Sequence, residues 1–442
     1  MSQLPCPHAT LRSVERYDSS ADYLEALASR GALPPGFGVA TAATAFEPPE
    51  RPGNELPIRV TLLLADEPAD AFAATLTRNT LRGAPVQIVA DLLARRAPVR
   101  GVVINNAVSN VGVATGVDDA TTVVDRLAAQ AGAAGQAFAP ASTGVIGWRL
   151  PFEPICAVLP GLVAACAPGS VVPAARAIMT TDRYPKVRGR RAGNATVVGI
   201  AKGAGMIEPS MATMLAFLLT DAAVDRDTLQ GLLDDAVRDS FNRISVDGDQ
   251  STSDMVLALS SQRAGGVSRE ALAEAIAGVC RDLAADIVRN GEGVEHVIRV
   301  AVDAPGTDER AAAIGKAVVN SPLVKTAVNG CDPNVGRLVS SIGDHLGTQP
   351  DPPPLAGATV RLGGVTVFSR GAFRLDGSKE EALAAYLRER SIDHALDYPP
   401  HDLAVEIDVE FEASAAGRRG HAVVLGADLS HGYVTENADY RS

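Results

Sequence analysis

The chain is 442 residues long, with 46% hydrophobic and 4% aromatic residues and a formal net charge of −12 at pH 7. This composition predicts a globular protein of two or three domains, and the acidic charge argues against nucleic acid or an anionic membrane as a partner. Five cysteines without a C-x-x-C pair suit a reducing compartment, and the scattered histidines predict no metal site. No apolar stretch is long enough for a signal peptide or a membrane helix, so we expect a cytoplasmic protein.

Hydrophobic periodicity predicts alternating strands and helices along most of the chain. Short β-branched runs predict strands, and apolar side chains three or four positions apart predict helices. The predicted elements are strands over 59–65, 99–104, 196–201, 255–259 and 404–411, a hairpin over 359–368, and helices over 85–93, 118–129, 173–179, 229–241 and 268–290, the last capped by Ser268. Alternation of this kind indicates an α/β fold built in layers.

Three polar stretches also carry structural signals. The basic run 185–193 predicts an exposed hairpin, because runs of charge usually face solvent. The polar residues around Lys325 and Asn334 predict a loop. Ser378 and Glu381 have the spacing of a capping box and predict the start of a further helix.

The stretch after the strand at 196–201 carries the strongest functional signal. Lys202, Gly203 and Gly205 form a glycine-rich turn, and Thr213 then places a hydroxyl inside the apolar run 211–215. A hydroxyl in apolar surroundings needs a partner. Three explanations are open: the Thr213 hydroxyl bonds to a nearby carbonyl, the stretch is a phosphate loop, or Thr213 is a self-cleaving nucleophile. The phosphate loop is disfavoured because Lys202 precedes the glycines.

The third explanation makes specific chemical demands on two neighbouring residues. The Thr213 hydroxyl would attack the carbonyl of Ala212, and hydrolysis of the resulting ester would free an amine on Thr213. That amine has a pKa of about 7.7–8.0 and can act as the base for its own hydroxyl. The small side chain of Ala212 leaves room for the attack.

The motif over 202–215 resembles the self-processing motif of the ornithine acetyltransferase family (bifunctional glutamate N-acetyltransferase / N-acetylornithine acetyltransferase). Further stretches resemble the same family in the same order: 142–147, 178–182, 240–249, 290–293, 323–327, 332–334 and 437–442. Each stretch alone is weakly specific, but their ordered set is specific. The resemblance favours self-cleavage between Ala212 and Thr213.

The resemblance implies a layered α/β sandwich that cleaves itself into two chains. It divides the sequence into an N-terminal extension over 1–35, an α-chain over 36–212 and a β-chain over 213–442, with a smaller α/β part from about residue 300. It also implies a cytoplasmic α2β2-type assembly of the cleaved chains. No functional interpretation follows for residues 1–35.

The resemblance also implies roles for individual residues. Thr213 is the nucleophile, and Thr143 with Gly144 forms an oxyanion hole, since two neighbouring donors are what such a hole requires. The implied substrate-binding residues are Thr181, Lys202, Thr213, Glu292, Asn437 and Ser442. Lys202 is expected to hold a carboxylate and Glu292 an ammonium group.

The implied reaction transfers an acetyl group from N-acetylornithine to glutamate by a ping-pong mechanism without a cofactor. The partners are therefore a small N-acetyl amino acid and an amino-acid acceptor. Departures from the family pattern at 105–110, Trp148 and Val335 leave the acceptor open. The alternatives are a related acyltransferase or an amidohydrolase acting on another N-acyl amino acid in a specialised pathway, and a binding protein that never cleaves.

Overall fold

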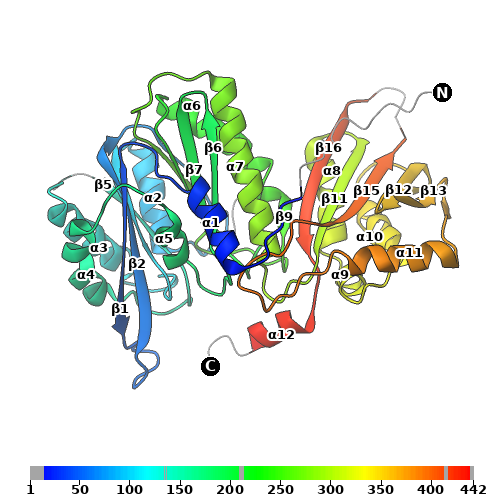
Figure 1. Ribbon diagram of the computed structural model, residues 1–442, viewed down its shortest axis with the longest axis horizontal. Helices are drawn as coiled ribbons and strands as arrows, with labels where there is room; N and C mark the ends of the chain where they lie inside the picture. The colour runs from blue at the N-terminus through cyan, green and yellow to red at the C-terminus, as the bar shows by residue number, and fades with distance from the viewer. Residues whose placement is uncertain (1–13, 134, 136, 209–213, 413–416, 439–442) are drawn as a thin grey trace.

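The computed structural model describes residues 14–133, 135, 137–208, 214–412 and 417–438. Within these ranges the chain forms three β-sheets with helices packed against them (Figure 1). The first two sheets enclose a shared core, and helices cover their outer faces. The third sheet has a core of its own. This arrangement confirms the predicted layered α/β sandwich.

The first sheet has the strand order β1-β2-β4-β5 and is antiparallel except for the β4–β5 pair. Its strands are β1 (Phe37–Phe46), β2 (Leu56–Ala69), β4 (Val99–Asn105) and β5 (Ala137–Ser142). Helices α3 (Gly116–Gln130) and α4 (Phe152–Ala164) pack on the outer face of this sheet. The loops after β4 and β5 run toward the functional site described below.

The second sheet has the order β3-β10-β8-β7-β6, in which β10 and β8 are parallel and the other pairs antiparallel. Its strands are β3 (Phe72–Leu76), β10 (Met255–Ser260), β8 (Leu215–Thr220), β7 (Ala195–Lys202) and β6 (Lys186–Ala192). Its outer face is covered by α6 (Arg226–Arg238), the 3₁₀ turn η1 (Phe241–Arg243) and α7 (Arg269–Arg289). As predicted, the Ser268 side chain caps α7.

The side chains of the second sheet alternate between two hydrophobic cores, one on each face of the sheet. Met255 and Leu257 of β10 enter the core between the sheets, whereas Val256 and Ala258 face the helices outside. Three further helices contribute to the core between the sheets: α1 (Ser20–Arg30), α2 (Ala84–Ala94) and α5 (Val172–Ala177). Both faces of the central strands β8 and β10 are thus buried, which fits their strongly apolar sequences.

The third sheet lies on the far side of α7 from the first two sheets (Figure 1). Its order is β14 (Ala372–Phe373), β13 (Val365–Ser369), β12 (Ala358–Leu362), β15 (Val405–Phe411), β11 (Val297–Pro305), β16 (Arg419–Ala427) and β9 (Ile244–Ser245). The remaining helical elements are α8 (Asp308–Val319), α9 (Pro322–Asn329), α10 (Val335–Gly347), η2 (Leu355–Gly357), α11 (Gly377–Arg388) and α12 (His431–Ala438).

Three local predictions were wrong. The run 185–193 does form a hairpin strand, but Lys186 is fully buried and Arg188 is largely buried, because both pair with acidic side chains. Lys325 lies in helix α9 rather than in a loop. Helix α11 is capped by Asp376, whose carboxylate accepts the Lys379 N–H, and not by Ser378.

Candidate active site

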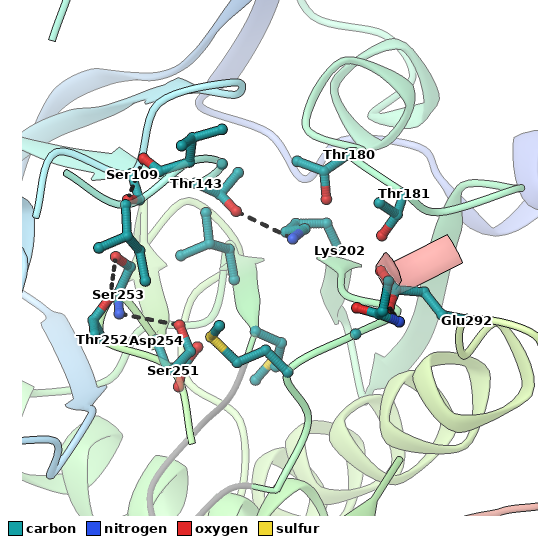
Figure 2. Close-up of a pocket in the computed structure, with 18 residues that line it drawn as sticks. Ser109, Thr143, Thr180, Thr181, Lys202, Ser251, Thr252, Ser253, Asp254 and Glu292 are labelled. Carbon is teal, nitrogen blue, oxygen red and sulfur yellow. Dashed lines mark hydrogen bonds between the residues drawn. The ribbon is translucent and has the colours of Figure 1, made fainter. Parts of the chain in front are cut away.

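A pocket of about 260 Å³ lies where β5 and β7 end and β8 begins. Figure 2 shows its polar side chains converging from several separate segments. The described residues that line it are Ser109, Thr143, Gly144, Val145, Ile146, Thr180, Thr181, Lys202, Gly205, Met206, Met214, Leu215, Ser251, Thr252, Ser253, Asp254, Glu292 and Asn437. A pocket of this size suits a small molecule.

The turn at Thr143 and Gly144 presents a hydrogen-bond donor to this pocket. Gly144 has φ of 125°, and a Cβ added there would lie 2.1 Å from the carbonyl carbon of Ala107, so only glycine fits. The N–H groups on either side are used, because Thr143 donates to Asn105 and Val145 to Ala107. Among the described residues, the Gly144 N–H has no protein acceptor, so it is available to a ligand.

Lys202 completes this donor group from the end of β7. Its ammonium group donates to the Thr143 hydroxyl oxygen at 3.1 Å, as the dashed line in Figure 2 marks. Lysine can only donate, so the Thr143 oxygen accepts here and its own O–H remains able to donate to a ligand. The arrangement therefore combines two donors with a positive charge, which favours a developing negative charge on an oxygen.

Glu292 provides the opposite charge on another wall of the pocket (Figure 2). Its carboxylate accepts hydrogen bonds from the Thr181 hydroxyl and from the Asn437 side-chain amide, the latter at 2.8 Å. Burial raises the pKa of Glu292, and these hydrogen bonds only partly oppose the rise. The Glu292 carboxylate also lies close to the backbone of Gly205, where only glycine fits, since a Cβ there would lie 2.1 Å from a carboxylate oxygen of Glu292. A ligand ammonium would favour the ionised carboxylate.

Asp182, which the sequence reasoning did not single out, holds two pocket loops together. Its buried carboxylate accepts the N–H of Gly203 at 2.7 Å, the N–H of Thr180 at 3.0 Å and the Lys186 ammonium at 2.5 Å. Burial acts to raise the pKa of Asp182, but the charges of Lys186 and Lys202 and these hydrogen bonds lower it well below its usual value. Asp182 therefore stays ionised and fixes the Lys202 and Thr181 loops relative to each other.

The structure brings together Thr143, Gly144, Thr181, Lys202, Glu292 and Asn437. The expected residues Ala212, Thr213 and Ser442 lie outside the described ranges. Trp148 and Val335 are buried in the hydrophobic cores and are not among the described lining residues. Thr180 lines the pocket beside the preferred Thr181. Four other polar lining residues were missed because Ser and Thr side chains carry no periodic signal; they are Ser109, Ser251, Thr252 and Ser253.

Most of the chain is similar to proteins of one known family. The model of the ArgJ family matches residues 55–442. The chain belongs to the ArgJ family. The arginine biosynthesis bifunctional protein ArgJ of Nitratidesulfovibrio vulgaris is 37% identical over 93% of this chain and 100% of its own length. The ArgJ protein of Methylococcus capsulatus is 39% identical over 86% of this chain and 91% of its own.

Among solved structures, the arginine biosynthesis bifunctional protein ArgJ of Bacillus halodurans is 33% identical and aligns with a TM-score of 0.44. The alignment covers 52% of this chain and 100% of that one. Membership of the ArgJ family confirms the resemblance stated from the sequence motifs. Among the described residues, no helix is long and apolar enough to cross a membrane.

Proposed function

We propose that the protein is a self-processing threonine acyltransferase that moves an acetyl group from N-acetylornithine to glutamate. The observation that carries this proposal is that Thr143, Gly144 and Lys202 line the same pocket as Glu292, in a chain of the ArgJ family. Met214, the residue that follows Thr213, lines the same pocket. The nucleophile is therefore expected at this site.

In the first half-reaction the Thr213 oxygen attacks the acetyl carbonyl of N-acetylornithine, and the Thr213 amine takes the hydroxyl proton. The carbonyl oxygen becomes an oxyanion that the Gly144 N–H and the Thr143 hydroxyl stabilise. Collapse of this intermediate breaks the C–N bond, and the departing nitrogen receives the proton. Ornithine leaves, and the acetyl group remains on Thr213 as an ester.

In the second half-reaction the amine of glutamate attacks the acetyl ester through the same oxyanion hole. The C–O bond to Thr213 breaks, a proton of the attacking amine passes through the Thr213 amine to the Thr213 oxygen, and N-acetylglutamate leaves. No cofactor enters either half, and the enzyme returns to its starting state. The order of events predicts ping-pong kinetics.

The two charged walls supply the substrate recognition that this reaction needs. Lys202 is assigned to a substrate carboxylate, and Glu292 with Thr181 and Asn437 to the side-chain ammonium of ornithine. Ser442 is assigned to the substrate from the family resemblance. Because Lys202 also donates to Thr143, carboxylate binding and oxyanion stabilisation share one cation.

Self-cleavage would leave chains of 212 and 230 residues that remain one folded body. The second sheet interleaves strands from both sides of the cut, with β3, β6 and β7 before it and β8 and β10 after it. We therefore propose an α-chain over 36–212 with its extension 1–35, a β-chain over 213–442 with its smaller part from about residue 300, and a cytoplasmic α2β2-type assembly. Light scattering of the purified protein tests the assembly.

The activity test is acetyl transfer from N-acetylornithine to a panel of amino acids, with ornithine, acetate and N-acetylated products measured separately. We expect N-acetylglutamate and ornithine in equal amounts. Acetate without any need for glutamate would instead identify an amidohydrolase. Transfer to another amino acid would identify a related acyltransferase, and an intact inactive chain would identify a binding protein.

Replacing Glu292 by Gln should raise the KM for N-acetylornithine at least tenfold, about 1.4 kcal/mol, because the ammonium loses its counter-charge. In the wild type, kcat/KM should fall with decreasing pH in two steps, as the Thr213 amine and Glu292 each take up a proton, and the raised pKa places the Glu292 step above the ordinary range for Glu. The Gln variant should lose the Glu292 step and keep the step of the amine. Steady-state kinetics across pH measures both effects.

Stability separates this role from a structural one. A raised pKa in the folded state means that stability falls as pH rises from the unfolded pKa through the folded one. Gln stays neutral and removes that cost, so the thermal midpoint at pH 7 should not decrease. Glu436→Gln is the matched control, because Glu436 pairs with Arg183 outside the pocket lining. An unchanged KM in Glu292→Gln would contradict the assignment.

A further inference from the structure

The three residues 206–208 lie just before the expected cleavage site and are held in an unusual turn. Met206 has φ of 58°, a left-handed conformation that costs a non-glycine residue about 1–2 kcal/mol. The Asp247 carboxylate accepts the Met206 N–H at 2.6 Å and the Ile207 N–H at 2.7 Å, one on each oxygen. Two successive N–H groups that point at one anion form a nest, so the carboxylate stabilises the turn.

The loop that carries Asp247 binds the same segment at two further points. Val246 donates its N–H to the Ile207 carbonyl at 2.7 Å, and Glu208 donates its N–H to the Asp249 carbonyl at 2.9 Å. The Glu208 carboxylate also accepts hydrogen bonds from the Ser245 hydroxyl and the Asn320 amide. Residues 206–208 are therefore fixed in both direction and register.

The part of the chain around the third sheet anchors this loop in turn. Lys325, in α9, is buried and donates to the Val246 carbonyl at 2.5 Å. Lys316, in α8, donates to the Ile244 carbonyl at 2.5 Å. The Tyr433 hydroxyl of α12 reaches the Asp247 carboxylate at 3.4 Å. These contacts connect the C-terminal part to the segment before the expected cut.

A second anchor holds the chain just after the expected cut. Leu215 begins β8, where it pairs with Lys202 of β7 and Met255 of β10, and the Met214 carbonyl accepts the Met255 N–H at 3.1 Å. In the sequence, the expected scissile bond between Ala212 and Thr213 is thus flanked by two anchored residues, Glu208 and Met214. Intramolecular attack depends strongly on such positioning of the reacting groups.

We propose that Asp247 is a positioning residue for self-cleavage. It holds Met206 and Ile207 in the left-handed turn that precedes the scissile bond in the sequence, and it acts through the backbone of these two residues. The step that it assists is attack of the Thr213 oxygen on the Ala212 carbonyl, which breaks the peptide C–N bond, forms an ester and frees the Thr213 amine. Water then hydrolyses the ester to the Ala212 carboxylate and the Thr213 hydroxyl. This inference rests on the proposed function, which requires that cleavage.

The test compares cleavage rates of wild type, Asp247→Asn and Asp249→Asn after cell-free synthesis, with the intact and cleaved chains separated on a denaturing gel. Asn can accept only one of the two N–H groups well, so Asp247→Asn should cleave at least tenfold more slowly. Asp249→Asn removes the same charge two residues away and leaves both N–H contacts in place. It should cleave at the wild-type rate.

Rescue separates positioning from mere folding. Glycine adopts positive φ readily, so Met206→Gly added to Asp247→Asn should recover at least threefold in cleavage rate. Asp247→Asn that cleaves like wild type would overturn the inference. A slow variant that glycine does not rescue and whose thermal midpoint has dropped would also overturn it, because Asp247 would then act through folding alone. Wild-type protein that never cleaves would instead overturn the proposed function.

Discussion

Replacing Thr213 by Ala should leave the chain uncut at 442 residues and without measurable acetyl transfer. The substitution removes the oxygen that attacks Ala212, and without the cut no amine becomes available to activate a nucleophile. We expect kcat to fall by at least about 10⁴-fold. Denaturing gel electrophoresis and mass spectrometry measure the cut, and N-terminal sequencing of the wild-type fragment should read Thr-Met-Leu-Ala.

Thr213→Ser is the matched control for this prediction, because it keeps a hydroxyl and a potential N-terminal amine. It should still cleave and still transfer acetyl groups, although more slowly than wild type. Fragments from Thr213→Ala cut at the same bond would show that another group performs the cleavage. A wild-type fragment that starts at any other residue would move the nucleophile away from Thr213.

Regular elements were predictable because local patterns mark them. The helix that begins after Ser268 buries side chains at helical spacing, and the strand at 255–259 is a short continuous apolar run that is buried on both faces, so the sequence indicates both elements directly. The prediction that the run 185–193 is exposed was wrong for the opposite reason. Arg188 pairs with Asp286 and Arg190 with Asp282, and no local pattern reveals partners so far away in the sequence.

The site shows the same division between local and distant information. Motif residues such as Thr143 and Glu292 were named from the sequence, and the structure places them in one pocket. The bond from Lys202 to Thr143 joins residues 59 positions apart and was not foreseen. Asp247 escaped notice as well, because its role depends on the backbone of Met206 and Ile207 rather than on its own neighbours.

Replacing Thr143 by Ala should lower kcat by roughly 10²–10³ while KM changes by less than a few-fold. The oxyanion exists only in the transition state and the tetrahedral intermediate, so a donor aimed at it contributes little to substrate binding. Gly144 retains its N–H in this variant, and this remaining donor limits the fall in kcat. Pre-steady-state measurement of ornithine release and steady-state kinetics with glutamate should show both half-reactions slowed, because both pass through the same oxyanion.

Two companion substitutions decide whether the Thr143 hydroxyl is responsible. Thr143→Ser keeps the hydroxyl that accepts from Lys202 and should retain most of kcat, whereas Thr143→Val keeps the shape and should lose as much as Thr143→Ala. A large rise in KM with kcat intact would make Thr143 a substrate-binding residue. Equal activity of the Val and Ser variants would mean that the oxyanion relies on the Gly144 N–H and the charge of Lys202 alone, since these are the groups that remain when the hydroxyl is gone.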